Sequence, residues 1–360
     1  MNMKEILKNL VEIPSVSSSK ENCKKSVNFI KDIAEKNGLK TKVFEKKNVY
    51  SLTIGKDITK SPKIILNGHL DVVPASKDMF KAKIEGNRMY GRGTSDMKGG
   101  DVAMLVALIE LVKEKINPDV LLILTTDEEP GGFNGVKNIV DLGFKSDIVF
   151  IPDGGDDAEV CTDEKGVLHI LLKADGRSAH GSRPWMGENA VLKLIDIFQI
   201  LEKDFEKGWG KATKDDNWKP TLNLGMLTGG EAANQVPNTA EMKIDIRFPS
   251  PVTLDLIKDM VKRSMKGQKG ISLEILSTGN PLHTDVNNPF VRSWKELFKR
   301  DIKFVKESGA SDARFFAEKD IPVILTKPKG SEPHVDNEWV DLNSLEEFKN
   351  MLKEWIKVNS

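Results

Sequence analysis

The sequence lacks the features that mark disulfide-rich, membrane and nucleic-acid-binding proteins. It contains two cysteines, Cys23 and Cys161, which lie far apart and outside any paired metal motif. Neither a disulfide framework nor a thiolate zinc site is therefore expected, and we predict that both are packed thiols. Lys plus Arg and Asp plus Glu both number 54. This balance argues against a general binder of nucleic acid or anionic lipid.

Long apolar runs are also missing. No run approaches the roughly 18 residues of a membrane span, and the first 20 residues have the spacing of an amphipathic helix rather than the uncharged centre of a signal peptide. There is no internal repeat and no G-x-S-x-G turn of a serine hydrolase. We expect a cytoplasmic protein with no membrane or nucleic-acid partner. Its 360 residues are too many for one ordinary core and predict two domains.

Four short apolar runs read as buried strands of a parallel sheet. They are KIILN, VLLILT, DIVFI and PVILT, at residues 63–67, 120–125, 147–151 and 322–326. Between the first two lies MKGGDVAMLVALIELVKEK, residues 97–115, whose length and apolar density suit a helix packed on a sheet. The sequence therefore predicts an α/β domain with a mostly parallel sheet flanked by helices.

The pattern changes from about residue 165 to residue 277. The order becomes strand, helix, strand, strand, helix, strand, and the alternation in MKIDIRF is typical of a half-exposed antiparallel sheet. We predict an inserted α+β (ferredoxin-like) domain at 165–277, with 1–164 and 278–360 forming a discontinuous catalytic domain. The polar stretch 206–220 reads as a mobile loop, and His169, inside an apolar strand, as a packed residue rather than a ligand.

Acidic and histidine residues follow each of the four apolar runs. In open parallel sheets ligands bind beyond the carboxyl ends of the strands. Carboxylates gathered there repel one another unless a cation neutralises them, and mixed imidazole and carboxylate ligation favours zinc, cobalt or manganese. Two imidazoles and several carboxylates suit two ions with a bridging carboxylate. The candidates are His69, Asp71, Asp96, Asp127, Glu128, Glu129, Asp153 and His334.

Five motifs carry a resemblance to a known family. GHLDVVPA, GRGTSDMKGG, TTDEEPGG, IPDGG and EPHVDNE, in this order, are similar to the motifs of the co-catalytic zinc peptidase and aminoacylase family. That family includes succinyl-diaminopimelate desuccinylase, acetylornithine deacetylase, glutamate carboxypeptidase and cytosolic dipeptidases. The resemblance covers nearly the whole chain and implies a zinc-peptidase-like catalytic domain with a lid and dimerisation domain inserted in it.

The resemblance also implies a role for each ligand. His69 and Asp153 would hold one metal ion, Glu129 and His334 the other, and Asp96 would bridge the two. The expected cofactor is thus two divalent ions per subunit, zinc first, with cobalt or manganese as alternatives.

Two further carboxylates have expected roles beside the ions. Asp71 would accept the remaining N–H of the His69 ring and fix its tautomer. Glu128 would be the general base that takes a proton from the attacking water and passes it to the leaving nitrogen. Taken alone, DEE before Pro130 is also compatible with a solvated turn or a helix cap.

The insert and one core loop supply further candidates by resemblance. GRSAHGSRP presents His180 as a lid histidine that stabilises the oxyanion, often from the partner subunit of a homodimer. NQVPNTAEMKIDIRFP implies that Asn234 and Arg247 hold a substrate carboxylate, and GASDARFF makes Ser311 and Arg314 candidates for substrate binding. A homodimer through the lid domain is expected.

The substrate stays open at this point. GASDARFF and the short insert favour a deacylase of N-acyl amino acids, of the desuccinylase or deacetylase type. Asp153 stands where such members usually have Glu and is more typical of aminopeptidases and dipeptidases. A non-catalytic binding protein of this fold would be marked by loss of the base or a ligand, whereas all six positions are present.

Overall fold

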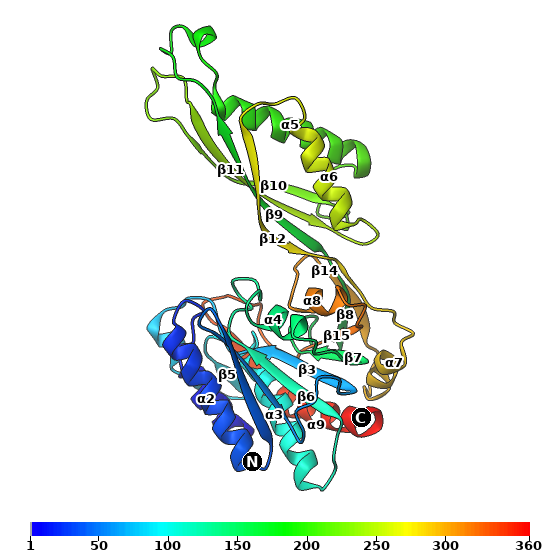
Figure 1. Ribbon diagram of the computed structural model, residues 1–360. Coiled ribbons are helices and arrows are strands. Elements are labelled where there is room, and N and C mark those ends of the chain that lie inside the picture. The colour runs from blue at the N-terminus through cyan, green and yellow to red at the C-terminus, as the bar shows by residue number, and fades with distance from the viewer. Residues whose placement is uncertain (1) are drawn as a thin grey trace. The chain divides into compact units, whose positions relative to one another are not determined.

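The computed structural model describes residues 2–360, which form two compact units (Figure 1). The core unit comprises residues 2–163, His283–Glu307 and Ser311–Ser360, and the insert unit comprises Glu164–Leu282 with Ser308–Ala310. The domain boundaries expected from the sequence, at 164/165 and 277/278, stay a prediction.

A nine-stranded mixed sheet forms the centre of the core unit. Its order is β1 (Lys40–Lys46), β2 (Val49–Gly55), β6 (Val120–Thr125), β3 (Ile64–His69), β7 (Ile148–Ile151), β15 (Val323–Leu325), β8 (Glu159–Glu164) and β13 (Leu282–His283), with β14 (Lys303–Glu307) also paired to β8. The strands β6, β3, β7 and β15 are mutually parallel. They correspond to the four apolar runs, so the predicted parallel core is confirmed.

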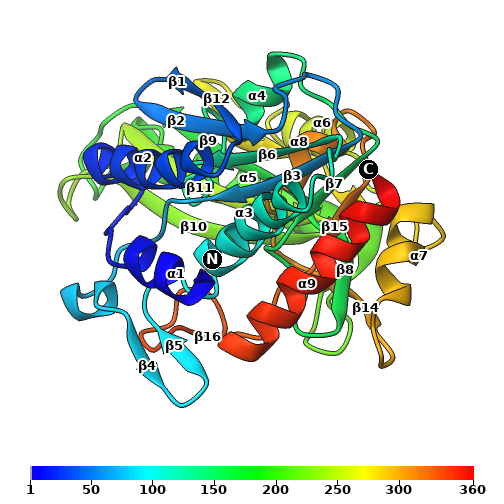
Figure 2. The same cartoon turned by 90° about the horizontal axis from the view of Figure 1, so that it is seen from below.

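Helices cover this sheet (Figure 2). They are α1 (Met3–Val11), α2 (Lys20–Lys36), α3 (Lys98–Lys113), α4 (Val136–Asp141), α7 (Pro289–Glu296), α8 (Ala313–Ala317) and α9 (Leu342–Asn359). Helix α3 packs against β3, β6 and α9, while α8 packs against β7, β15 and α4. Because α3 meets neighbours on most sides, its side chains are almost all buried, which explains why its sequence is apolar all round.

A three-stranded sheet lies apart from the main one. It pairs β4 (Lys83–Glu85), β5 (Arg88–Tyr90) and β16 (Trp339–Asp341), and it joins segments about 250 residues apart, since Trp339 lies opposite Tyr90. The sequence did not predict it, because strands of three residues are too short to show an alternating pattern.

The insert unit has the predicted order of strands and helices. It runs β9 (Gly166–Asp175), α5 (Ala190–Trp209), β10 (Thr221–Gly229), β11 (Thr239–Phe248), α6 (Leu254–Ser264) and β12 (Ile271–Gly279). All neighbours are antiparallel in the order β10-β11-β9-β12, which is ferredoxin-like. Apolar side chains of β9 and β11 pack with those of α5 and α6 to form its core.

One boundary in the insert was predicted wrongly. The stretch expected as a loop from residue 206 is helical as far as Trp209, because Phe205 and Trp209 stack edge to face at 5.1 Å and both pack on the core. Gly210, at φ +72°, ends the helix.

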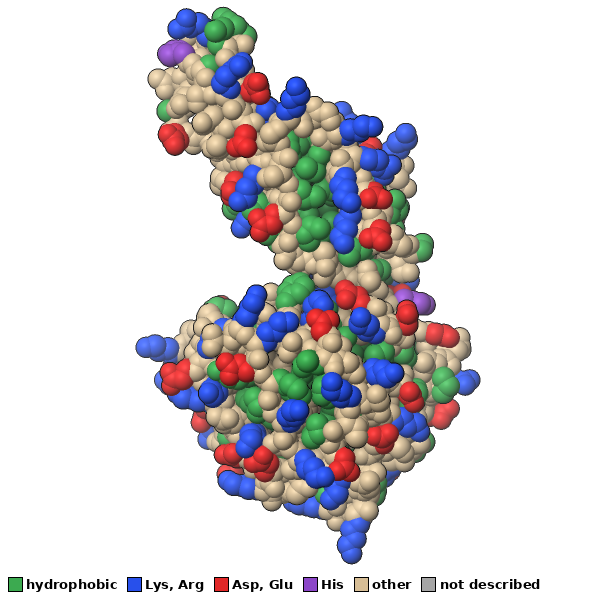
Figure 3. Space-filling model, viewed as in Figure 1, with side chains coloured by type: hydrophobic (Ala, Val, Ile, Leu, Met, Phe, Trp, Pro, Cys, Tyr) green, Lys and Arg blue, Asp and Glu red, His purple; other side chains and the backbone are tan. Residues whose placement is uncertain are grey.

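The cysteines and the helices can be compared with what the sequence led us to expect. Cys23 and Cys161 are both buried thiols outside any disulfide, as predicted. Within the described residues 2–360, no helix has the length and apolarity needed to cross a bilayer. On the face seen in Figure 3, basic and acidic side chains are interspersed over each unit.

Candidate metal centre and active site

Three parallel strands deliver ionisable side chains to one edge of the core sheet. Strand β3 ends at His69, β6 is followed by Asp127, Glu128 and Glu129, and β7 is followed by Asp153. Since β3 lies between β6 and β7 and runs parallel to both, the three ends meet at the same edge.

At this edge the structure brings together two groups that could hold a metal ion. The first contains His69, Asp96 and Asp153, and the second contains Asp96, Glu129 and His334, with the ligand atoms of each group within 4.8 Å of one another. These are the five residues expected as ligands.

Asp96 belongs to both groups and turns one oxygen toward each. Its Oδ1 lies 3.2 Å from Nε2 of His69, and its Oδ2 lies 3.2 Å from Nε2 of His334. Nε2 of His334 also lies 3.2 Å from Oε2 of Glu129. Two atoms that each lie about 2.1 Å from a tetrahedral ion are about 3.4 Å apart. The spacing therefore fits one cation between Asp96 and His69 and a second cation between Asp96, Glu129 and His334.

The surroundings of His69 point the same way. Its Nε2 is buried and has no hydrogen-bond partner among residues 2–360, whereas its Nδ1 lies 3.0 Å from the carbonyl oxygen of Asp71. Because a carbonyl only accepts, Nδ1 carries the proton and Nε2 presents its lone pair to the cluster. Nitrogen and carboxylate donors together are the set that zinc, cobalt and manganese accept.

Two carboxyl groups of the cluster, those of Asp153 and Glu129, have raised pKa values. Burial raises the pKa of Asp153 well above its ordinary value, and the charge of Asp96 adds to this. Burial, together with the charges of Asp96 and Glu128, raises the pKa of Glu129 to about 7. Such a site needs bound protons or cations for neutrality, and metal ions would displace the protons.

Glu128 lies at the centre without belonging to either group. Its Oε2 is 3.9 Å from Nε2 of His69, its side chain is 15% exposed, and burial raises its pKa. A buried carboxylate near the ligands with a raised pKa has the properties of a general base.

Asp71 has contacts that the sequence did not predict. Its carboxylate accepts the backbone N–H groups of Glu128 and Glu129, at 3.2 and 3.3 Å, and the hydroxyl of Ser17 at 2.7 Å. The His69 ring meets the carbonyl of Asp71 at 3.0 Å and the carboxylate only at 3.6 Å. The side chain thus anchors the loop of the expected base, while the tautomer is set by the carbonyl. Ser17, after α1, carried no sequence signal.

In the insert unit, His180 and Asn234 lie on adjacent segments. The N–H of Gly181 donates to the carbonyl of Asn234 at 2.7 Å, and His180 forms a β-bridge with Gln235. Nδ1 of His180 accepts the backbone N–H of Ser182 at 3.1 Å. A neutral ring must therefore carry its proton on Nε2, which makes the exposed Nε2 a donor.

Arg247 lies on the face of the insert sheet opposite the helices. Its Nε donates to Oδ1 of Asp245 at 2.8 Å, and the same oxygen lies 3.0 Å from Nε2 of His169. His169 is thus paired and 38% exposed at its side chain rather than packed in the core. Within residues 2–360, the polar contacts of the Arg247 guanidinium involve Nε and Nη2, so the Nη1 end of its fork can still donate to an anion.

Ser311 and Arg314 lie in the core unit and are both buried. Nη2 of Arg314 donates to the carbonyl of Gly131 at 2.7 Å, and Nη1 to the carbonyl of Ser311 at 3.2 Å. Arg314 therefore holds the loop that follows Glu129. Its contact with a substrate stays a prediction.

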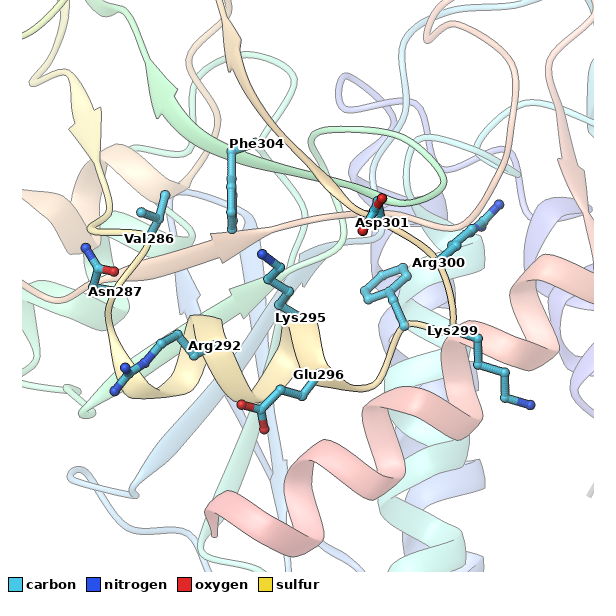
Figure 4. Close-up of a pocket in the computed structure, with 10 residues that line it drawn as sticks. Val286, Asn287, Arg292, Lys295, Glu296, Lys299, Arg300, Asp301 and Phe304 are labelled. Atoms are coloured by element: carbon cyan, nitrogen blue, oxygen red, sulfur yellow. The ribbon is translucent and has the colours of Figure 1, made fainter.

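A separate hollow of about 730 Å³ lies between α7 and β14. Lys295 points toward Phe304, whereas Arg292 and Glu296 point away from it (Figure 4). Because its charged groups diverge, this hollow does not form a second catalytic constellation.

Imidazole and carboxylate groups at the carboxyl edge of a parallel sheet, in a chain that also has a ferredoxin-like insert, are typical of a metal-dependent enzyme. The model of the peptidase family M20/M25/M40 matches residues 65–358. The chain belongs to this metal-dependent family.

Similar proteins cover the chain nearly end to end. A probable succinyl-diaminopimelate desuccinylase of Staphylococcus aureus (strain MSSA476) is 26% identical over 354 residues, with 87% of this chain and 86% of that protein covered. A succinyl-diaminopimelate desuccinylase of Sulfurovum sp. (strain NBC37-1) is 25% identical over 377 residues, covering 99% of each. The crystal structure of an M20 family metallo-carboxypeptidase, Sso-CP2 from Sulfolobus solfataricus, has a TM-score of 0.80 at 20% identity, covering 100% of this chain and 99% of that one.

Proposed function

We propose that this protein is a two-metal hydrolase that cleaves an amide bond in an N-acyl amino acid or a small peptide. His69 and Asp153 would hold one ion, Glu129 and His334 would hold the other, and Asp96 would be a ligand of both. The observation that carries this proposal is the position of Asp96, whose two oxygens each lie 3.2 Å from a different histidine. Zinc is the expected ion, with cobalt or manganese as alternatives.

Glu128 and His180 have separate roles in the proposed reaction. When bound, the ions would lower the pKa of water toward about 7 and polarise the scissile carbonyl. Glu128 takes a proton from the attacking water and returns it to the leaving nitrogen. Asp71 keeps Glu128 in place through the backbone N–H contact at 3.2 Å. The N–H at Nε2 of His180, fixed by Ser182, donates to the oxygen that gains negative charge.

Arg247 and Asn234 bind the substrate carboxylate in this proposal. Nε of the Arg247 guanidinium donates to Asp245, and its Nη2 lies 3.5 Å from Nε2 of His169, which leaves the Nη1 end for a carboxylate. Within the core unit, Ser311 and Arg314 are the proposed contacts to the substrate. The curated relatives are named for removal of a succinyl group from a diamino dicarboxylic acid, which favours the N-acyl amino acid as substrate. A dipeptide is the alternative substrate, because an Asp at position 153 is more typical of aminopeptidases and dipeptidases.

The proposal includes a homodimer formed through the insert. Leu192 and Ile200 on α5 and Leu256 on α6 are large apolar side chains that are 55%, 43% and 43% exposed. A second copy would cover them. Light scattering coupled to size exclusion should give twice the mass of 40.1 kDa. The cytoplasm stays the predicted compartment.

Two measurements test the function. The purified protein, loaded with zinc, cobalt or manganese, is offered N-succinyl and N-acetyl amino acids beside a panel of dipeptides, and we expect release of amine from the N-acyl compounds. Glu128→Gln should keep close to two ions per chain and lose turnover by two orders of magnitude or more, as expected for removal of a general base (about 10²–10⁴-fold). Full activity of Glu128→Gln would remove Glu128 as the base, and one ion per chain would remove the bridging role of Asp96. A chain that binds its ions and turns over none of the compounds would favour a binding protein of this fold.

A further inference from the structure

One buried ion pair joins the two loops that carry Asp96 and His334. Nη1 of Arg92 lies 2.8 Å from Oε2 of Glu338, and the two side chains are 3% and 0% exposed. Arg92 follows β5 and Glu338 precedes β16, so the antiparallel pairing of Tyr90 with Trp339 places them opposite each other. The small sheet that the sequence did not predict therefore creates this pair.

The Glu338 carboxylate organises the backbone that leads to Asp96. Its Oε2 also accepts the N–H of Gly93 at 3.0 Å, and its Oε1 accepts the N–H groups of Ser95 and Asp96 at 2.8 and 3.1 Å. Four donors thus surround one buried carboxylate. The last of them belongs to Asp96 itself.

Arg92 reaches the second loop with its other terminal nitrogen. Nη2 donates to the carbonyl oxygen of His334 at 3.3 Å, and nearby the hydroxyl of Ser95 donates to the carbonyl of Ser331 at 2.9 Å. His334 has a φ of +65° and a side chain that is 52% exposed. Packing alone therefore does not hold this residue in its left-handed conformation, and the contact from Arg92 does so in part.

We propose that Arg92 and Glu338 are positioning residues that set the separation of Asp96 and His334, and through it the coordination of the metal pair; this inference rests on the proposed function. A buried ion pair can often be replaced by apolar side chains without loss of stability. An apolar side chain at residue 338 could not accept the N–H groups of Gly93, Ser95 and Asp96. The particular contribution of this ion pair is thus to fix the conformation of the two loops that carry Asp96 and His334.

The test compares Glu338→Gln and Arg92→Lys with wild type and with Lys349→Met. Gln keeps the shape of Glu338, but its amide nitrogen donates, so part of the set of four donors loses its acceptor. Lys keeps the charge of Arg92, but a single ammonium cannot replace the fork that spans Glu338 and His334. Lys349, 5% exposed, pairs with Glu110 at 3.1 Å between α9 and α3 and with Glu346 at 2.8 Å, and it contacts no proposed ligand, so its loss reports on ion pairs away from the metal centre.

Each protein is stripped of metal and titrated with Co²⁺ while the visible absorption is recorded. Thermal unfolding of the metal-free form is measured in parallel. We expect Glu338→Gln and Arg92→Lys to bind Co²⁺ about 10 to 100 times more weakly, the range found for groups that orient ligands, and to shift the absorption bands. Lys349→Met should lower the unfolding temperature and leave the Co²⁺ affinity and spectrum at wild-type values.

Wild-type affinity and spectrum in folded Glu338→Gln and Arg92→Lys would overturn the inference, as would an equal loss of affinity in Lys349→Met. If Glu338→Gln does not fold, Arg92→Lys decides by the same criteria. A wild-type protein that binds no Co²⁺ would instead refute the proposed function, and with it this inference.

Discussion

Gly100, near the start of α3, offers a sharp test of how tightly the core unit packs beneath the metal centre. A Cβ added there would lie 2.6 and 2.7 Å from Cγ and Cβ of Pro152, the residue before Asp153. Gly→Ala in a helix normally gains about 0.5–1 kcal/mol, but overpacking costs about 1–3 kcal/mol. Because the proline ring is rigid, we expect Gly100→Ala to lose up to about 2 kcal/mol of unfolding free energy, measured by urea denaturation of the metal-free protein.

Gly208 provides the matched control for this substitution. It lies in the last turn of α5, and an added Cβ would meet nothing within 4 Å. Gly208→Ala should therefore be neutral or gain up to about 1 kcal/mol. Gly100→Ala should also displace Asp153 and weaken metal binding, whereas Gly208→Ala should not. If Gly100→Ala were as stable as Gly208→Ala and bound metal normally, the close approach of α3 to Pro152 would not constrain the site.

Three further predictions concern metal removal, the insert loop and pH. Chelation should lower the unfolding temperature of the protein in scanning calorimetry and zinc should restore it, because a site filled at 100 times its Kd contributes about 2.7 kcal/mol; superimposable scans would contradict this. Lys165→Met should speed chymotryptic cleavage near Trp218 several-fold, since Nζ of Lys165 donates to the carbonyls of Asn217 and Lys219 at 2.6 and 3.0 Å; unchanged digestion would show that the loop is held otherwise. Burial opposes the ionisation of Asp245, but the contacts with His169 and Arg247 outweigh it and lower the pKa of this carboxyl group. The ionised group therefore stabilises the folded insert at pH values above the ordinary Asp pKa of about 3.9. This stabilisation is lost as the pH falls through the lowered pKa. Asp245→Asn should remove that part of the acid dependence, below about 1 kcal/mol because the pair is partly exposed; an identical acid dependence in wild type and variant would exclude it.

The parts of the fold that the sequence predicted share a physical cause. The strands β3, β6, β7 and β15 are buried on both faces, so each reads as a continuous apolar run, and parallel strands with covered faces must deliver their last residues to one edge. The insert was readable because β11 alternates between a covered and an open face, seen in its burial pattern. The positions of residues close to strand ends, such as His69 and Asp153, could therefore be predicted from the apolar run that each one ends or follows.

The supporting contacts were not predictable in this way. Arg92 and Glu338 are separated by 246 residues, and only the pairing of two three-residue strands brings them together. Ser17 meets Asp71 across 54 residues from a loop without any periodic pattern. Such contacts depend on the assembled fold, which single-residue propensities and short motifs do not encode.

Buried carboxylates that bind backbone N–H groups recur around the proposed metal centre. Asp71 anchors the N–H groups of Glu128 and Glu129, Glu338 anchors those that lead to Asp96, and Asp127 accepts two N–H groups at the turn before α4. Neutral acceptors could have held these loops with less repulsion between like charges. Arg92 balances the charge of Glu338, but Asp71 and Asp127 add negative charge beneath an edge that already gathers several carboxylates, and this strengthens the attraction for a cation. The same side chains thus fix the loops and favour the proposed ions, and the ions in turn offset the repulsion among their anchors.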